Sequence, residues 1–167
     1  PGNRFMKDDM EIVSSRAISF AVDDPEGYAN EQLNLELIRD ITYIPEAGHL
    51  YLLNRENEIY KLDRKGHLVG KIVHTGRGPG EMELPLQLKY RNNKLYVLDY
   101  NNNKSIVFDN NERWLQDITL HFGSLFSFEV TAKNEIILPR IIPVEGATES
   151  QFLFIGHEGR IIRTTPG

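Results

Sequence analysis

Few side chains in this sequence could do chemistry. Five histidines stand at positions 49, 67, 74, 121 and 157, and no two of them have the i,i+4 or His-x-His spacing typical of zinc sites. The chain has no cysteine, which excludes disulfides, thiolate nucleophiles and cysteine-bound metals. It also has no Gly-x-Ser-x-Gly elbow and no Asp-x-Asp calcium loop. The sequence therefore predicts no catalytic residue and no metal ligand.

The most distinctive motif is the run His-Thr-Gly-Arg-Gly-Pro-Gly-Glu-Met at residues 74–82. A glycine-rich loop can bind phosphate, but the Gly-Lys-Ser/Thr ending and a following helix are missing. We instead expect a joint between two elements, because its glycines permit positive φ and close backbone approach while its proline stiffens the path. Arg77 and Glu81 are expected to form a local ion pair or cap.

Polar residues end predicted strands at repeated positions: Asn54, Asp63, Asp99 and Asp109. Such side chains accept hydrogen bonds from backbone N–H groups of the turn that follows. A catalytic site seldom needs the same residue in every unit, so the repetition favours hairpin capping. Asparagine tolerates positive φ, and we expect the run 101–103 to form a tight corner.

These residues are placed by a unit that recurs along the chain. Leu50, Leu95 and Ile136 head matching strands, at spacings of 45 and 41 residues. Strands are predicted at 40–44, 50–54, 59–63 and 68–73 in the first copy, and at 86–90, 95–99, 105–109 and 114–120 in the second. The third copy is weaker, with strands at 135–138 and 152–155 and a longer middle loop at 141–150.

A period near forty residues with several short strands per copy is typical of β-propeller blades. Continuous apolar runs such as Leu50–Leu53 are expected in strands that are buried on both faces. We therefore predict an all-β fold of propeller blades, each with four antiparallel strands, forming part or half of a six-bladed ring. A β-sandwich is the alternative, although it would not require so regular a repeat.

Composition excludes several classes of protein. The 167 residues are 40% hydrophobic and 26% charged, which is ordinary for a globular domain, and no apolar run could span a bilayer. A net charge of −5 argues against a nucleic-acid partner, which would need a basic face. Because the chain begins with Pro1, we expect its true N-terminus to have been removed or to lie upstream.

The joint and the strands around it resemble a known group. Gly76–Glu81, followed by Leu95-Tyr96-Val97-Leu98-Asp99 and Ile106-Val107-Phe108-Asp109, is similar to the NHL-type six-bladed β-propellers and, more closely, to the six-bladed propeller proteins abundant in Bacteroidetes. The resemblance covers residues 38–123 well and the flanking residues loosely. It implies an extracytoplasmic protein, at the cell surface or in the periplasm, often lipid-anchored upstream of this chain.

The resemblance also suggests how the chain is organised. Residues 1–37 would be an N-terminal lead-in with a possible ring-closing strand, and 38–84, 85–123 and 124–167 three blades of one continuous propeller domain. Closed propellers have four to eight blades, so we expect a fragment of a longer ring or a half-ring that a homodimer completes. A four-bladed ring using residues 12–37 is the alternative.

With a scaffold but no catalytic constellation, the first functional hypothesis is a non-catalytic binding or scaffold module without a cofactor. Its ligand, a glycan, peptide or protein, would lie on one rim of the ring. The expected contacts come from the crossing and middle loops: His74, Arg77, Tyr100, Asn101 and Glu145. One alternative is a propeller hydrolase, lactonase or lyase, in which strand-ending carboxylates would hold Ca²⁺ in the channel; another is a self-assembling half-propeller.

Overall fold

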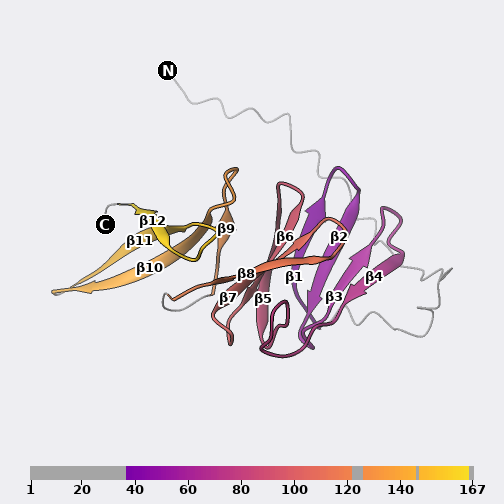
Figure 1. The fold of residues 1–167 in the computed structure, drawn as a ribbon, viewed down its shortest axis with the longest axis horizontal. Helices are drawn as coiled ribbons and strands as arrows, with labels where there is room; N and C mark the ends of the chain where they lie inside the picture. The colour runs from indigo at the N-terminus through magenta and orange to yellow at the C-terminus, as the bar shows by residue number, and fades with distance from the viewer. Residues whose placement is uncertain (1–36, 122–125, 146, 166–167) are drawn as a thin grey trace, which may run out of the picture.

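The computed structural model of the chain describes residues 37–121, 126–145 and 147–165 (Figure 1). Within them, three antiparallel sheets of four strands follow one another in chain order. The predicted all-β fold with four-stranded antiparallel units is thereby confirmed. The predicted lead-in, with its possible ring-closing strand, lies outside the described residues apart from residue 37.

Each sheet is ordered simply, with strands that are neighbours in sequence paired side by side. The first sheet contains β1 (Ile38–Ile44), β2 (His49–Asn54), β3 (Ile59–Leu62) and β4 (Leu68–Ile72). The second contains β5 (Pro85–Arg91), β6 (Lys94–Asp99), β7 (Lys104–Asp109) and β8 (Trp114–Thr119). The third contains β9 (Glu129–Val130), β10 (Ile136–Val144), β11 (Ala147–Ile155) and β12 (Ile161–Thr164).

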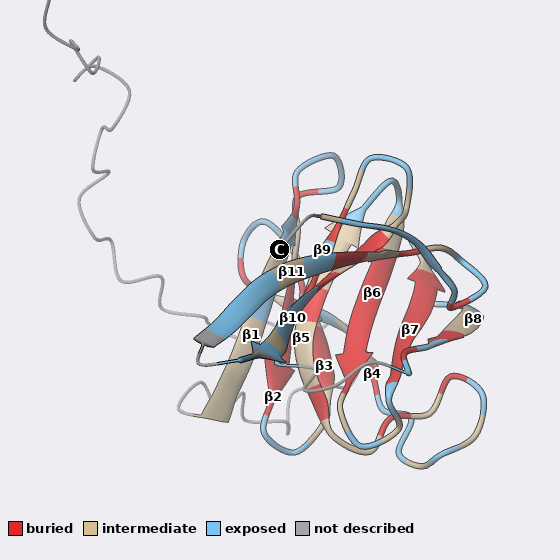
Figure 2. Cartoon of the chain, turned by 90° about the vertical axis from the view of Figure 1, so that its left-hand side faces the viewer, coloured by how far each residue is buried: buried red, intermediate tan, exposed pale blue. Residues whose placement is uncertain are grey.

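Two of the three buried clusters of the described residues lie between the sheets, and the third is formed by first-sheet residues alone. Tyr51 and Leu53 of the first sheet pack with Val97 and Phe108 of the second in one buried cluster. A second cluster joins the second and third sheets, and includes Tyr96, Leu98, Val107, Ile118, Ile136, Leu138 and Leu153. Figure 2 shows β6 and β7 buried along almost their whole length. The continuous apolar runs predicted this burial on both faces. Burying one large apolar side chain stabilises the folded state by about 1.5–3 kcal/mol.

Local turn chemistry fixes the hairpins. Asn54 Oδ1 accepts hydrogen bonds from the backbone N–H groups of Glu56 at 2.9 Å and Glu58 at 2.8 Å. Asp63 and Asp109 accept the equivalent pairs of bonds in their own turns. Three of the four predicted caps are thereby confirmed. Asparagines take positive φ in the corners at positions 57, 92, 93, 103 and 134, as their short polar side chains allow.

The third sheet corrects one prediction. Residues 141–150 were expected to form a loop, but β10 and β11 continue through them as one long hairpin, from the pair Ile136 and Ile155 to the pair Val144 and Ala147. β9 pairs with β10 only at Ile136 and Ile137. The rest of β10 is therefore an edge strand, where proline costs no ladder hydrogen bond. Pro139 and Pro143 are compatible with a strand for this reason.

Candidate functional site

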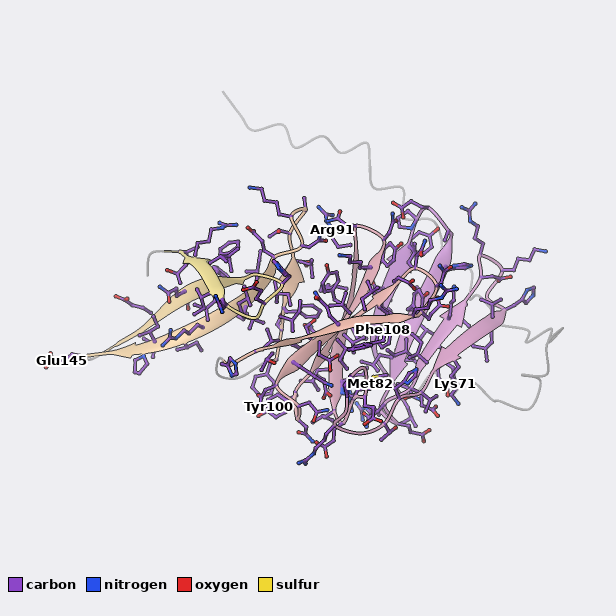
Figure 3. The ribbon with its side chains drawn as sticks, viewed as in Figure 1. Lys71, Met82, Arg91, Tyr100, Phe108 and Glu145 are labelled. Atoms are coloured by element: carbon purple, nitrogen blue, oxygen red, sulfur yellow. The ribbon has the colours of Figure 1, made fainter. Side chains whose placement is uncertain are left out.

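The glycine-rich joint connects β4 with β5 and lies at the same end of the sheets as the β2–β3 and β6–β7 loops. We call this surface, formed by residues 54–58, 73–84 and 99–104, the joint rim. Hydrogen bonds connect its three segments: Asn57 Nδ2 donates to Glu83 O at 2.9 Å, and Asn102 Nδ2 donates to Gly76 O at 2.9 Å. Met82 and Tyr100 mark this end of the molecule in Figure 3.

Asp99 holds the end of the joint. It is fully buried, and its carboxylate accepts hydrogen bonds from the backbone N–H groups of Glu83 at 2.9 Å and Leu84 at 2.8 Å, and from Asn102 Nδ2 at 2.7 Å. The capping prediction was therefore wrong in detail for this residue. Asp99 caps the chain that enters its own sheet, because the joint returns to β5 directly beside the end of β6.

Lys104 and Asp117 hold the middle of the joint. The Lys104 side chain is 8% exposed, and its Nζ donates to Gly78 O at 2.8 Å and to Asp117 Oδ2 at 2.7 Å. Asp117 also accepts hydrogen bonds from Gly80 N and from Trp114 Nε1 at 2.9 Å. A buried ammonium and a carboxylate are thus satisfied together, as charges removed from water require.

The expected Arg77–Glu81 ion pair is not formed. Glu81 Oε2 accepts a hydrogen bond from Gly78 N at 2.8 Å, so this side chain caps the loop. Arg77 pairs instead with Glu83, with Nη2 and Oε1 3.1 Å apart, and the hydrogen bond to Glu83 raises the pKa of the guanidinium. The Arg77 side chain is 79% exposed, although the backbone of the joint that carries it is held by Asp99 and Lys104.

The other predicted contacts divide into two groups. His74 and Asn101 are exposed on the joint rim. Tyr100 donates its backbone N–H to Leu84 O at 3.0 Å and stacks its ring on Phe126, with centroids 5.5 Å apart. Glu145, in contrast, lies at the far tip of the β10–β11 hairpin (Figure 3), because the long hairpin projects beyond the rim. The structure therefore brings four of the five predicted contacts onto one surface and leaves Glu145 apart.

Two further clefts, which no sequence pattern predicted, lie at other parts of the described structure. One, of about 330 Å³, is lined by Tyr43, Pro45, Glu46, Tyr90, Arg91, Asn92 and Asn93, at the end of the molecule opposite Tyr100 (Figure 3). Tyr43 and Tyr90 occupy matching register positions, opposite Leu50 and Leu95. Aligning the strands that precede the first turn of each copy would have found this pair.

A second cleft, of about 380 Å³, lies between the second and third sheets, near the same end. It is lined by Lys94, Tyr96, Gln116, Ile118, Lys133, Asn134, Glu135, Gly156, His157 and Ile162. These residues come from segments up to 68 positions apart. No pattern within one copy of the repeat could therefore indicate the cleft.

An internal polar contact connects the first two sheets. Lys61 Nζ lies 2.6 Å from Glu112 Oε1, and the buried Tyr51 hydroxyl donates to the same oxygen. Burial and this hydrogen bond raise the pKa of Tyr51, so the phenol stays protonated as a donor. The contact serves sheet packing rather than a site.

Among the described residues, no three His, Asp or Glu side chains gather closely enough to hold a metal ion. In the same part of the chain, no helix has the length and apolar character needed to cross a bilayer.

The architecture and the joint define a class of protein. Stacked four-stranded antiparallel sheets, in which the chain passes from the last strand of one sheet to the first strand of the next, are β-propeller blades. A family described as 6-bladed beta-propeller matches residues 30–138. The chain belongs to this family, and its described sheets are part of a six-bladed propeller.

Solved structures show the same fold at low sequence identity. A Bacteroides fragilis protein, which its description assigns to the exported proteins, is 18% identical with a TM-score of 0.61, over 81% of this chain and 40% of its own. Hydrazine synthase of Kuenenia stuttgartiensis is 16% identical with a TM-score of 0.55, over 76% of this chain and 36% of its own. U3-55K is 13% identical with a TM-score of 0.57, over 82% of this chain and 41% of its own.

The chain thus spans about two fifths of the length of the structures it matches. The comparison with curated proteins found no match.

Proposed function

We propose that this chain is a non-catalytic, extracytoplasmic binding module that holds a glycan, peptide or protein ligand on its joint rim. The resemblance to exported propellers of Bacteroidetes supports the location outside the cytoplasm. The rim supplies exposed polar side chains, Arg77, His74 and Asn101, together with the half-buried Tyr100. Polar and aromatic groups of this kind are typical of ligand-binding surfaces.

A single observation carries the proposal. The backbone of the joint is held by Asp99, Lys104 and Asp117 from the second sheet, while the Arg77 side chain remains 79% exposed. A surface group on a braced backbone loses less conformational entropy on binding than one on a free loop. The joint rim is therefore organised before any ligand arrives.

Arrays of defined glycans and peptides, followed by titration of each positive compound, would test the proposal. We expect at least one compound to bind saturably, and the double variant Arg77→Ala/Asn101→Ala to weaken it about tenfold, as the loss of a charge-assisted hydrogen bond predicts. Arg91→Ala, an exposed arginine at the opposite end (Figure 3), is the matched control. Equal weakening by the control variant, or no saturable binding, would overturn the proposal.

Self-association is the second candidate, with a second copy completing the ring. It is favoured by large apolar side chains on the third sheet, where Ile141 is 70% exposed and Phe152 48% exposed. Contiguous apolar surface of this kind often marks an interaction site. Light scattering after size exclusion is the test: a discrete dimer that Phe152→Glu dissociates supports ring completion, and a monomer at all concentrations contradicts it.

A further inference from the structure

The cleft between the second and third sheets carries an excess of positive charge. Lys94, which is half-buried, and the exposed Lys133 both line it. Within the described part of the chain, neither lysine forms a salt bridge, although the charge of Lys133 interacts with that of Glu135. His157 adds a third nitrogen-bearing side chain. The protein as a whole carries a net charge of −5, so this cleft is more basic than the average of the chain.

The only carboxylate among the cleft residues is already neutralised. Glu135 Oε2 lies 2.9 Å from Arg163 Nη2 and also accepts a hydrogen bond from Thr131 Oγ1 at 3.2 Å. The hydrogen bond from Arg163 lowers the pKa of Glu135, so the carboxylate stays ionised and paired. Arg163 is its salt-bridge partner, and the charge of Lys133 also lowers its pKa from beyond salt-bridge distance.

Asn134 adds a hydrogen-bond donor whose orientation is fixed by its neighbours. Asn92 Nδ2 donates to the backbone oxygen of Ala132 at 2.8 Å and to Asn134 Oδ1 at 2.9 Å. Because a backbone carbonyl can only accept, the Asn92 atom must be the amide nitrogen. The Asn134 atom facing it must then be the amide oxygen, which also accepts from the buried Tyr96 hydroxyl at 3.1 Å.

The Asn134 amide nitrogen therefore points away from these two partners, and it forms no hydrogen bond with the described residues. Lys94, Lys133 and Asn134 thus line one cleft. Oxyanions are the ligands that such a set of donors recognises, through charge-assisted hydrogen bonds. A volume of about 380 Å³ is at the small end of the range for ligand pockets.

From this geometry, we infer that the cleft between the second and third sheets binds a small ligand carrying a carboxylate or sulfate group, with Lys94, Lys133 and Asn134 as the anion-binding residues. An acidic sugar and a free inorganic anion share this chemistry. The site is separate from the joint rim, so the inference goes beyond the proposed function and stands or fails independently of it.

Titration of the purified protein with glucuronate, glucose and inorganic sulfate tests the inference. The readout is the side-chain amide signal of Asn134 in ¹H–¹⁵N NMR spectra, together with calorimetry. We expect glucuronate or sulfate to bind saturably and to shift this signal, while glucose, which lacks the charge, does not. Affinity should fall as ionic strength rises, because salt screens the ammonium groups. Tighter binding of glucuronate would identify an acidic sugar, and equal binding of sulfate a free anion.

Variants locate the site. Lys94→Gln and Lys133→Gln should each weaken the anion about tenfold, while Lys65→Gln, an exposed lysine in the β3–β4 turn, should leave it unchanged. Asn134→Asp keeps the oxygen that accepts from Tyr96 and Asn92, and aspartate tolerates positive φ, so the melting temperature should not change. The variant replaces the amide donor with a carboxylate oxygen, so it should abolish binding of the anion. Equal weakening by Lys65→Gln, binding of glucose, or no saturable binding of either anion would overturn the inference.

Discussion

The carboxylate of Asp40 on β1 accepts a hydrogen bond from the backbone N–H of Leu88 on β5, with Oδ2 and N 2.6 Å apart. The two residues belong to different sheets, 48 positions apart. β5 is the first strand of its sheet, and the Leu88 N–H lies on the edge that no further strand of that sheet pairs. The Asp40 side chain therefore satisfies a backbone donor that strand pairing leaves open.

The same relationship recurs one sheet later. Gln87 Oε1 accepts a hydrogen bond from Phe128 N at 3.0 Å. Asp40 and Gln87 each lie at the register shift in the first hairpin of their sheet, opposite Leu53 and Leu98. A polar side chain at this position thus attaches the first sheet to β5 and the second sheet to the residue that precedes β9. The repeat encodes not only the strands but also their lateral attachment.

Removing this attachment should destabilise the protein. Asp40→Ala leaves the Leu88 N–H without its partner, and we expect it to lower the free energy of unfolding by about 1–3 kcal/mol. Asp40→Asn retains an acceptor oxygen and should lose less than half as much. Urea unfolding measures both. If the two variants lost equal stability, the hydrogen bond would not be the cause.

The joint should not tolerate a side chain at Gly80. Its φ is +73°, and a Cβ atom there would lie 2.9 Å from ring atoms of Trp114. We expect Gly80→Ala to cost about 1–3 kcal/mol, from backbone strain and displacement of the indole. Gly70→Ala is the matched control, because its Cβ would meet only Lys61 at an ordinary 3.6 Å. Thermal unfolding should show a clear loss for the first variant and little or none for the second.

Lys104 should control the rigidity of the joint. Lys104→Met removes the ammonium that bonds Gly78 O and leaves the Asp117 carboxylate with less compensation. Breaking a buried ion pair by removing one partner lowers the free energy of unfolding by about 3–5 kcal/mol. We expect a loss at the lower end of this range, because Asp117 keeps its Gly80 and Trp114 donors. Hydrogen exchange at Gly80 should become faster. Unchanged exchange would show that the joint is held without this contact.

Glu58 should contribute to stability at neutral pH but not in acid. Burial alone would raise the pKa of this carboxyl, but hydrogen bonds from Tyr60, Lys71 and Asn54 outweigh it and lower the pKa below the ordinary value. A group with a lowered folded-state pKa stabilises the protein above its unfolded pKa, which is about 4.3 for glutamate, and loses that contribution as pH falls through the folded value.

The stability difference between the native protein and Glu58→Gln should therefore be constant from pH 7 to about 5 and shrink below about pH 4. Melting temperatures across this range give the measurement, and Glu56→Gln, an exposed neighbour in the same turn, is the control. A difference that stays constant down to pH 3 would contradict the assignment.

Much of the fold could be predicted from short patterns. Strand positions follow from apolar runs such as Leu95–Leu98, and corners follow from residues that tolerate positive φ, such as Asn92 and Asn93. The exception is the β10–β11 hairpin. Pro143 and Gly146 indicated a loop, and only the shortness of β9 made β10 an edge strand that accepts proline.

The candidate sites, like the fold, depend partly on short sequence patterns and partly on contacts between sheets. The sequence alone predicted the repeat and three of the four hairpin caps, because the repeat recurs in the sequence itself and each of these caps bonds to backbone groups within four residues. Only the stacking of the sheets places His74, Arg77, Tyr100 and Asn101 on one surface. Tertiary structure decided which groups satisfy one another between sheets: Asp40 with Leu88, Lys104 with Gly78, and Asn92 with Asn134. These partners lie 26 to 48 positions apart. Their contacts exist only because apolar burial stacks one sheet on the next and fixes the distance and register between them.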